Sequence, residues 1–174
     1  MMSLTIPVGP DDHVHGPQTA SVVLVEYGDY QCPYCANAYV IVKLLQGQLD
    51  PLLRFVFRNF PLSQVHPQAT LAAEAAEAAG VQDKFWAMHV ALYENQPVLS
   101  PDLIQALAQE LKLDMERFQN DVESGRFRER VKHDFMGGVR SGVSGTPAFF
   151  INGERYDGSW DETSLGTALR AAAK

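Results

Sequence analysis

The sequence predicts an α/β fold in which helices flank a central mixed β-sheet and an all-helical insertion interrupts the chain. Three observations support this prediction. The first sixty residues alternate a β-branched strand pattern, a helical pattern and a second strand pattern. Residues 62–140 then carry helical periodicity throughout, and a strand pattern with a hairpin turn returns at residues 148–158.

Composition limits the classes of protein that this chain can represent. Its 174 residues are 46% hydrophobic and 20% charged, which suits a single domain spanning residues 1–174. The net charge is −7 and no run of Lys or Arg occurs, so we expect no nucleic-acid partner and no anionic membrane surface. No continuous apolar segment is long enough to cross a bilayer.

The N-terminal third predicts a strand, a helix and a second strand. Residues 1–19 are rich in Gly and Pro and read as an irregular or loosely strand-like segment. Residues 21–27 form a β-branched apolar run typical of a strand buried on both faces. A helix is expected from Pro33 to about residue 48, and an aromatic-rich strand follows at residues 52–59. This order indicates a parallel strand pair with a right-handed crossover.

The middle of the chain predicts a series of helices. Their expected ranges are 67–79 with Gly80 as the C-terminal cap, 84–94, 103–111 after the Ser100-Pro101-Asp102 start, a helix from Asp114 to 124–125, and 126–139.

The C-terminal part predicts a hairpin and a last helix. Strands at 148–151 and 155–158 flank Asn152-Gly153, a favoured hairpin turn, and Ser159 or Asp161 caps the final helix. The predicted elements follow the order strand, helix, strand, helical block, hairpin and helix. This is the order of a thioredoxin fold split by a helical insertion. We place the core at about residues 20–61 and 141–174, and the insertion at about 62–140.

The two cysteines of the chain lie in Cys32-Pro33-Tyr34-Cys35, where the first predicted helix begins. A helix N-terminus favours a thiolate, so we predict that Cys32 is the nucleophile at a protein surface. Cys35, one turn further, is placed to resolve a mixed disulfide by attacking Cys32. Pro33 stiffens the turn, and Tyr34 shapes access or contacts a partner. A zinc half-site is the alternative, but it lacks a second cysteine pair.

Glu26 interrupts the apolar strand six positions before Cys32. A buried carboxylate is costly unless it is paired or protonated, so beneath a dithiol it could take and return the proton of Cys35. The alternative is a hydrated position at the strand end.

Thr146-Pro147 directly precedes the strand at 148–151. A proline can begin a strand but not continue a central one. The pattern fits a cis Thr–Pro bond that presents backbone groups beside Cys32, where a substrate peptide adds as an extra strand.

Three motifs together resemble the DsbA-like branch of the thioredoxin superfamily. They are Val25 to Cys35, Phe57 to Leu62 and Gly145 to Gly153. The resemblance implies a cis Pro147 opposite the dithiol, Cys32 as nucleophile, Cys35 as resolving thiol and Glu26 as the buried acid. Members of this family often carry His at the position of Tyr34. Tyr34 cannot add positive charge near the sulfur, so we expect a less extreme oxidant.

The predicted function is a thiol–disulfide oxidoreductase that acts on protein thiols or disulfides without a bound cofactor or metal. Pro33-Tyr34 also occurs in glutaredoxins, so a glutathione-linked reductase or transferase, with glutathione or another thiol donor as partner, is one alternative. A non-catalytic metal-binding or interaction module is another. The first ten residues lack the basic and long apolar regions of a secretory signal, which predicts a cytoplasmic location in a bacterium or archaeon.

Overall fold

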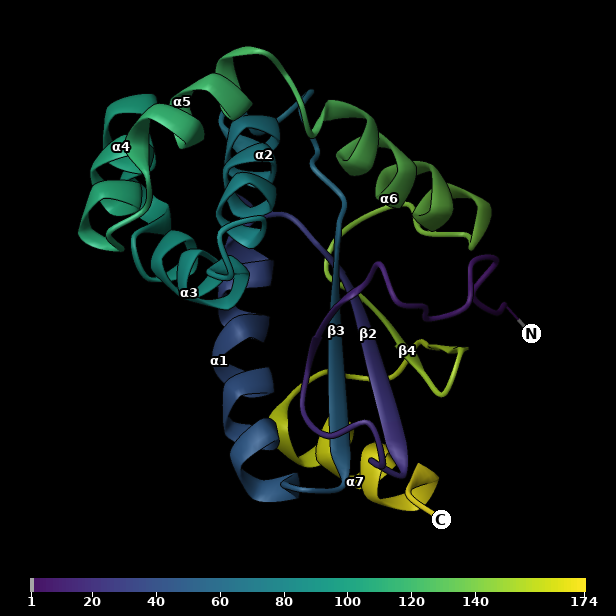
Figure 1. Cartoon of the computed structure of the whole chain (residues 1–174). Coiled ribbons are helices and arrows are strands. Elements are labelled where there is room, and N and C mark those ends of the chain that lie inside the picture. Colours follow the sequence, from purple (N-terminus) through teal and green to yellow (C-terminus); the bar gives the residue numbers. More distant parts are fainter. Residues whose placement is uncertain (1) are drawn as a thin grey trace.

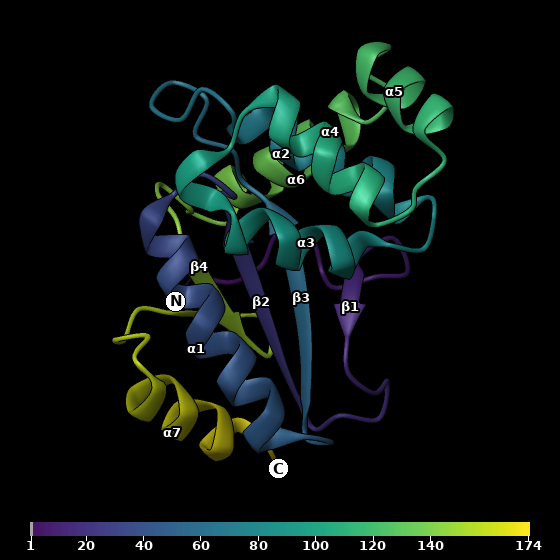
Figure 2. The ribbon, with the colours of Figure 1, turned by 90° about the vertical axis from the view of Figure 1, so that its left-hand side faces the viewer.

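The structure is a computed structural model that describes residues 2–174. Its five-stranded sheet has the order β1-β3-β2-β4-β5 (Figures 1 and 2). The strands are β1 His13–His15, β2 Val22–Gly28, β3 Leu53–Asn59, β4 Ala148–Ile151 and β5 Glu154–Tyr156. The helices are α1 Pro33–Leu49, α2 Ala69–Gly80, α3 Phe85–Glu94, α4 Pro101–Glu110, α5 Met115–Glu123, α6 Arg128–Arg140 and α7 Glu162–Ala172, with a 3₁₀ turn η1 at Gln96–Val98.

The predicted strand–helix–strand unit is present at the centre of the sheet. β2 and β3 pair in parallel from Val22 opposite Leu53 to Gly28 opposite Asn59, and α1 connects them. β4 pairs antiparallel with β2 on its other side. The sheet is therefore mixed, as expected, and β2 lies between two neighbours. All but one of the residues of β2 are buried, which explains its continuous β-branched sequence.

Side chains of β2 and β3 alternate between two buried layers because successive residues of a strand point to opposite faces. Leu24 and Phe55 belong to the larger core, which also holds the buried face of α1. Val25 and Val56 belong to a second core. Figure 1 shows α1 on one side of the sheet and α6 on the other. Gly138 allows α6 this close approach, since a Cβ there would lie 2.7 Å from the ring of Phe60.

The N-terminal segment is more ordered than its sequence indicates. β1 pairs antiparallel with β3 at the edge of the sheet. Asp12 forms an ion pair of 2.8 Å with the buried Arg58 of β3, and Arg58 also donates to the carbonyl oxygens of Ile6 and Pro7. The long-range ion pair, rather than local propensity, holds this Gly- and Pro-rich segment in place.

Helices α2 to α5 gather beyond the end of the sheet where β2 leads into α1 (Figure 2). Side chains of Ser100 and Asp114 cap α4 and α5 by accepting from the N–H groups of Leu103 and Arg117, as predicted. The expectation that Gly80 caps α2 is wrong. Gly80 is the last helical residue, and the chain turns at Asp83, which has a φ of +60°. The division into core and insertion stays a prediction.

Candidate active site

The dithiol segment lies where β2 ends and α1 begins. Cys32 is the N-cap of α1, Pro33 follows at the first helical position, and the carbonyl of Cys32 accepts from the N–H of Ala36 at 3.2 Å. The N–H of Cys32 donates to the carbonyl of Asp29 at 3.1 Å, which closes the connecting turn. Cys35 stands one turn into the helix, and both cysteines are free thiols.

Cys32 has the properties of a thiolate nucleophile. Its pKa is lowered from 9.0 to about 5. The largest cause is the hydrogen bond from the Cys35 thiol, which burial opposes. The backbone N–H groups of Cys35 and Tyr34 add to the stabilisation of the thiolate. The helix N-terminus therefore contributes as expected, but the second cysteine contributes more.

Cys35 shows the opposite shift. Burial raises the pKa of its thiol well above 9.0, and the hydrogen bond to Cys32 and the charges of Glu26 and Cys32 raise it further. The N–H of Asp29 donates to its sulfur at 3.5 Å. One cysteine is thus held ionised near neutral pH while the other is held protonated.

The expectation that Cys32 lies at the protein surface is wrong for the residue itself, because its neighbours cover it. The residue is 3% exposed, and its Sγ lies 3.6 Å from the carbonyl oxygen of Thr146, which accepts from the thiol when Cys32 is protonated. The residues that follow are open to solvent, since Pro33 is exposed and the side chain of Tyr34 is 65% exposed. The sulfur therefore faces the Thr146–Pro147 turn, and the exposed residues Pro33 and Tyr34 lie beside it at the surface.

Glu26 lies in the middle of the sheet and not at a hydrated strand end. It pairs with Phe57 of β3 and Phe149 of β4, and it is 2% exposed. Burial raises the pKa of its carboxyl from 4.5 to about 8, and the charge of Cys32 adds to this effect. A carboxyl with this pKa can hold or release a proton near neutral pH.

Thr146 and Pro147 lie opposite the dithiol and are joined by a cis peptide bond. Ala148 then begins β4, in agreement with the expectation that Pro147 precedes the strand. The structure thus brings together Cys32, Cys35, Thr146 and the buried Glu26.

Several residues that sequence reasoning missed hold the dithiol turn. The buried Gln96, in η1, donates to the carbonyl oxygens of Tyr30 at 2.9 Å and Cys32 at 2.7 Å. Asp29 accepts from the N–H of Leu62 and from His66 Nδ1 at 2.8 Å. Their partners lie 33 to 66 positions away in the sequence, so no local pattern identifies them. The segments after β3 therefore fasten the turn that carries Cys32.

Metal-ligating side chains do not gather in the described part of the chain. Within residues 2–174, no group of three or more His, Cys, Asp or Glu side chains is arranged to hold a metal ion.

Comparison with known proteins identifies the family. Residues 9–171 match the thioredoxin family model, so the chain belongs to the thioredoxin family. Within it, the fold is that of the DsbA-like proteins, as the resemblance implied.

Solved structures agree over nearly the whole chain. A thioredoxin-like oxidoreductase from Silicibacter pomeroyi is 30% identical, with a TM-score of 0.80 and coverage of 94% of this chain and 93% of that one. BdbD from Bacillus subtilis is 25% identical, with a TM-score of 0.83 and coverage of 92% and 91%. Alpha-DsbA1 from Wolbachia pipientis shares the fold at 18% identity, with a TM-score of 0.82 and coverage of 98% and 96%.

The curated relatives that match this chain are named as Na⁺/H⁺ antiporters, and they are longer than this chain. The Na⁺/H⁺ antiporter NhaA 1 of Salinispora arenicola is 44% identical over 173 residues, which are 99% of this chain and 26% of that protein. NhaA 3 of Salinispora tropica is 42% identical with the same coverage. The chain therefore spans about a quarter of the length of these relatives. Of the helices in residues 2–174, none has the length and apolar character needed to span a bilayer.

Proposed function

We propose that this protein is a thiol–disulfide oxidoreductase that exchanges disulfides with protein substrates through Cys32 and Cys35. The observation that carries the proposal is the opposite shift of two thiol pKa values within one hydrogen-bonded pair. The pKa of Cys32 is about 5, so its thiol is ionised at neutral pH, whereas burial raises the pKa of Cys35 and keeps its thiol protonated. The oxidoreductase relatives of similar length support it.

In the reducing direction, the Cys32 thiolate attacks one sulfur of a substrate disulfide. A Cys32–substrate mixed disulfide forms, and the second substrate sulfur leaves as a thiolate. Glu26 in its ionised form takes the proton of Cys35, and the Cys35 thiolate attacks Sγ of Cys32. This step forms the Cys32–Cys35 disulfide and releases the first substrate sulfur as a thiolate. Two electrons pass from the dithiol to the substrate, and the reverse sequence oxidises a substrate dithiol.

Thr146, Pro147 and Tyr34 are the proposed substrate contacts. The carbonyl of Thr146 lies 3.6 Å from Sγ of Cys32, so a substrate strand that pairs along this turn brings its own sulfur toward Cys32. The exposed ring of Tyr34 and the neighbouring Pro33 lie next to Cys32, where such a substrate strand would contact them. Aromatic rings at such positions bury large apolar area against a partner.

The proposal is tested by reduction of insulin with dithiothreitol in the presence of each variant. We expect Cys32→Ser to lose the catalysed rate entirely, because the remaining thiol, Cys35, is buried and held protonated. When it is reduced and then mixed with insulin after the dithiothreitol has been removed, Cys35→Ser should accumulate a mixed disulfide at Cys32 that mass spectrometry detects. Leu44→Ala, an exposed position of α1, serves as the control and should retain the full rate. Equal rates for the unmodified protein and Cys32→Ser would show that the dithiol does not act.

The same variants address the glutathione alternative. Incubation of Cys35→Ser with oxidised glutathione, followed by mass spectrometry, reports whether glutathione forms a stable adduct at Cys32. An adduct together with a rate of insulin reduction no greater than the uncatalysed rate would favour a glutathione-linked enzyme over the proposed protein substrates.

A further inference from the structure

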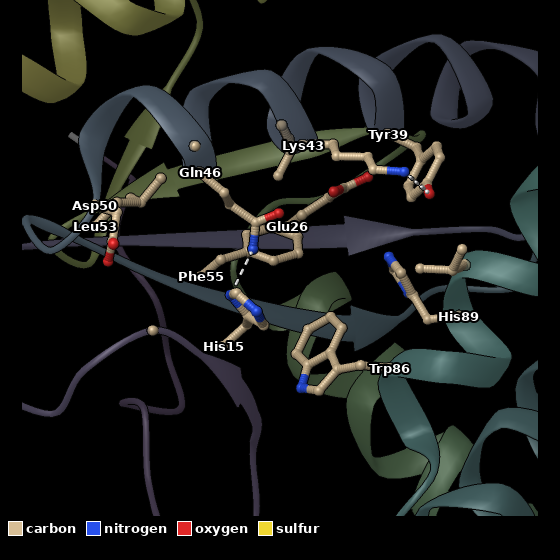
Figure 3. Close-up of a pocket in the computed structure, with 14 residues that line it drawn as sticks. His15, Glu26, Tyr39, Lys43, Gln46, Asp50, Leu53, Phe55, Trp86 and His89 are labelled. Atoms are coloured by element: carbon tan, nitrogen blue, oxygen red, sulfur yellow. Dashed lines mark hydrogen bonds between the residues drawn. The ribbon is translucent and has the colours of Figure 1, made fainter.

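A cavity of about 500 Å³ lies between α1, α3 and the sheet. Figure 3 shows Tyr39, Lys43 and Gln46 of α1 along one side and Trp86 and His89 of α3 opposite. Glu26 lies between these two helices in the close-up. His15, of the edge strand β1, also lines the cavity, and its Nδ1 is hydrogen-bonded to Gln46 Nε2 at 3.1 Å.

The carboxyl of Glu26 is the buried polar group of this cavity that lacks a protein partner. Among residues 2–174, no side chain or backbone group hydrogen-bonds to its Oε1. Buried polar atoms are almost always satisfied by protein or by water. A cavity of this size holds several water molecules, and Gln46, His15, Lys43 and Tyr39 Oη supply the polar partners that ordered water needs.

We propose that this cavity is a water-filled route along which protons pass between solvent and Glu26, separate from the surface on which substrates bind. The proposal rests on the proposed function, because it assigns the route by which Glu26 exchanges the proton of Cys35. Cys32, Tyr34, Thr146 and Pro147 are not among the residues that line the cavity. A protein seated on Cys32 therefore leaves the cavity open, and the proton can leave during the mixed-disulfide step.

Within residues 2–174, no ionised side chain forms an ion pair with Glu26 that could carry its proton in place of water. The titratable groups around it come from every element packed against the cavity. They are Tyr30 and Cys32 from the turn before α1, Cys35, Tyr39 and Lys43 from α1, Asp50 after it, His15 from β1, and His89 and Tyr93 from α3. Lys43 is largely exposed and is bound to Glu94 at 3.4 Å. His89 is buried with a pKa of about 3, so it is neutral, and its Nδ1 is hydrogen-bonded to Tyr30 Oη. Water is the remaining proton carrier.

The test closes the cavity at two independent positions. Gln46→Trp places a large ring at the half-buried position that bonds His15, and Val90→Trp fills the wall contributed by α3. Leu44→Trp is the matched control, because Leu44 is on the same helix, 46% exposed and outside the cavity. All three are made in a Cys35→Ser protein that carries a cysteine peptide disulfide-bonded to Cys32, so that the substrate surface is covered.

The measurement is the rate at which Glu26 ionises after a rapid pH jump across its titration midpoint. The infrared band of its protonated carboxyl is assigned by its loss in Glu26→Gln. We expect the peptide-bearing protein and the Leu44→Trp control to ionise as fast as the peptide-free protein. Either cavity variant should slow the ionisation at least about tenfold, equivalent to about 1.4 kcal/mol in barrier.

Two results would overturn the proposal. One is ionisation in both cavity variants as fast as in the control. The other is slowing by the peptide alone, which would place the route on the substrate surface. A Cys32→Ser protein with full insulin-reducing activity would instead refute the proposed function, and the infrared measurement does not depend on that activity. Unfolding midpoints of the variants separate slowed proton transfer from a disturbed fold.

Discussion

Replacing Glu26 by glutamine should make the stability of the reduced protein less dependent on pH. The carboxyl has a pKa of 4.5 when solvated and about 8 in the folded protein. Between these values the folded state binds more protons than the unfolded state, so the free energy of unfolding falls as pH rises. The stabilising contribution is complete below pH 4.5 and is lost as pH rises through about 8.

The magnitude follows from the size of this interval. Each pKa unit corresponds to about 1.4 kcal/mol, so ionising Glu26 in the folded protein costs at most about 5 kcal/mol. The adjacent cavity is lined by polar side chains such as Lys43 and Gln46, which lower the cost of a charge beside it, and we therefore expect a loss of about 2–5 kcal/mol between acidic and alkaline pH. Glutamine keeps the shape of the side chain without the charge, so this loss should be absent in Glu26→Gln.

Urea unfolding of the reduced protein at a series of pH values measures the effect. The informative quantity is the difference in unfolding free energy between Glu26→Gln and the unmodified protein, because the other titrating groups largely cancel in it. That difference should shift in favour of the variant as pH rises. Glu110→Gln, at an exposed position of α4, should change stability by no more than about 0.5 kcal/mol at any pH. A difference for Glu26→Gln that does not vary with pH would refute the reasoning.

Three further outcomes follow from the geometry. The ultraviolet absorbance of the Cys32 thiolate should titrate with a midpoint near pH 5. Cys35→Ala should raise that midpoint, because the hydrogen bond from the Cys35 thiol is the largest cause of the lowered pKa of Cys32. An unchanged midpoint would contradict this cause. Gln96→Leu removes two buried hydrogen bonds to the dithiol turn and should lower the free energy of unfolding in urea by about 1–3 kcal/mol. Gly138→Ala should lower the free energy of unfolding by about 1–3 kcal/mol, because the added Cβ meets the ring of Phe60 in the second core. Gly47→Ala has open space around it and should raise the free energy of unfolding by about 0.5–1 kcal/mol. Equal effects of the two substitutions would refute the packing argument.

The order of the elements was predictable because most of it depends on local interactions. A β-branched run, Pro33 at the first turn of a helix and Asn152-Gly153 between two strands each favour one local conformation. In the hairpin turn both Asn152 and Gly153 adopt positive φ, the conformation that this pair favours. Local rules failed at Gly80, where α2 ends in a hydrogen-bonded turn that continues to Asp83.

The candidate site was predictable in its chemistry but not in its surroundings. A cysteine pair at the start of a helix and an acid within an apolar strand identify a redox site because each residue is unusual in its own segment. The roles assigned to Cys32, Cys35, Glu26, Thr146 and Pro147 stay predictions until the variants are measured, as does the cytoplasmic location.

The sequence by itself determined that two cysteines begin a helix after a buried strand, and that this strand contains Glu26. Tertiary structure alone decided that Cys32 is covered, that Gln96 holds its carbonyl group and that a cavity opens beside Glu26. The reason is physical. Helix starts and strand patterns arise from interactions within a few residues, whereas burial, cavities and contacts across 64 positions depend on how whole elements pack.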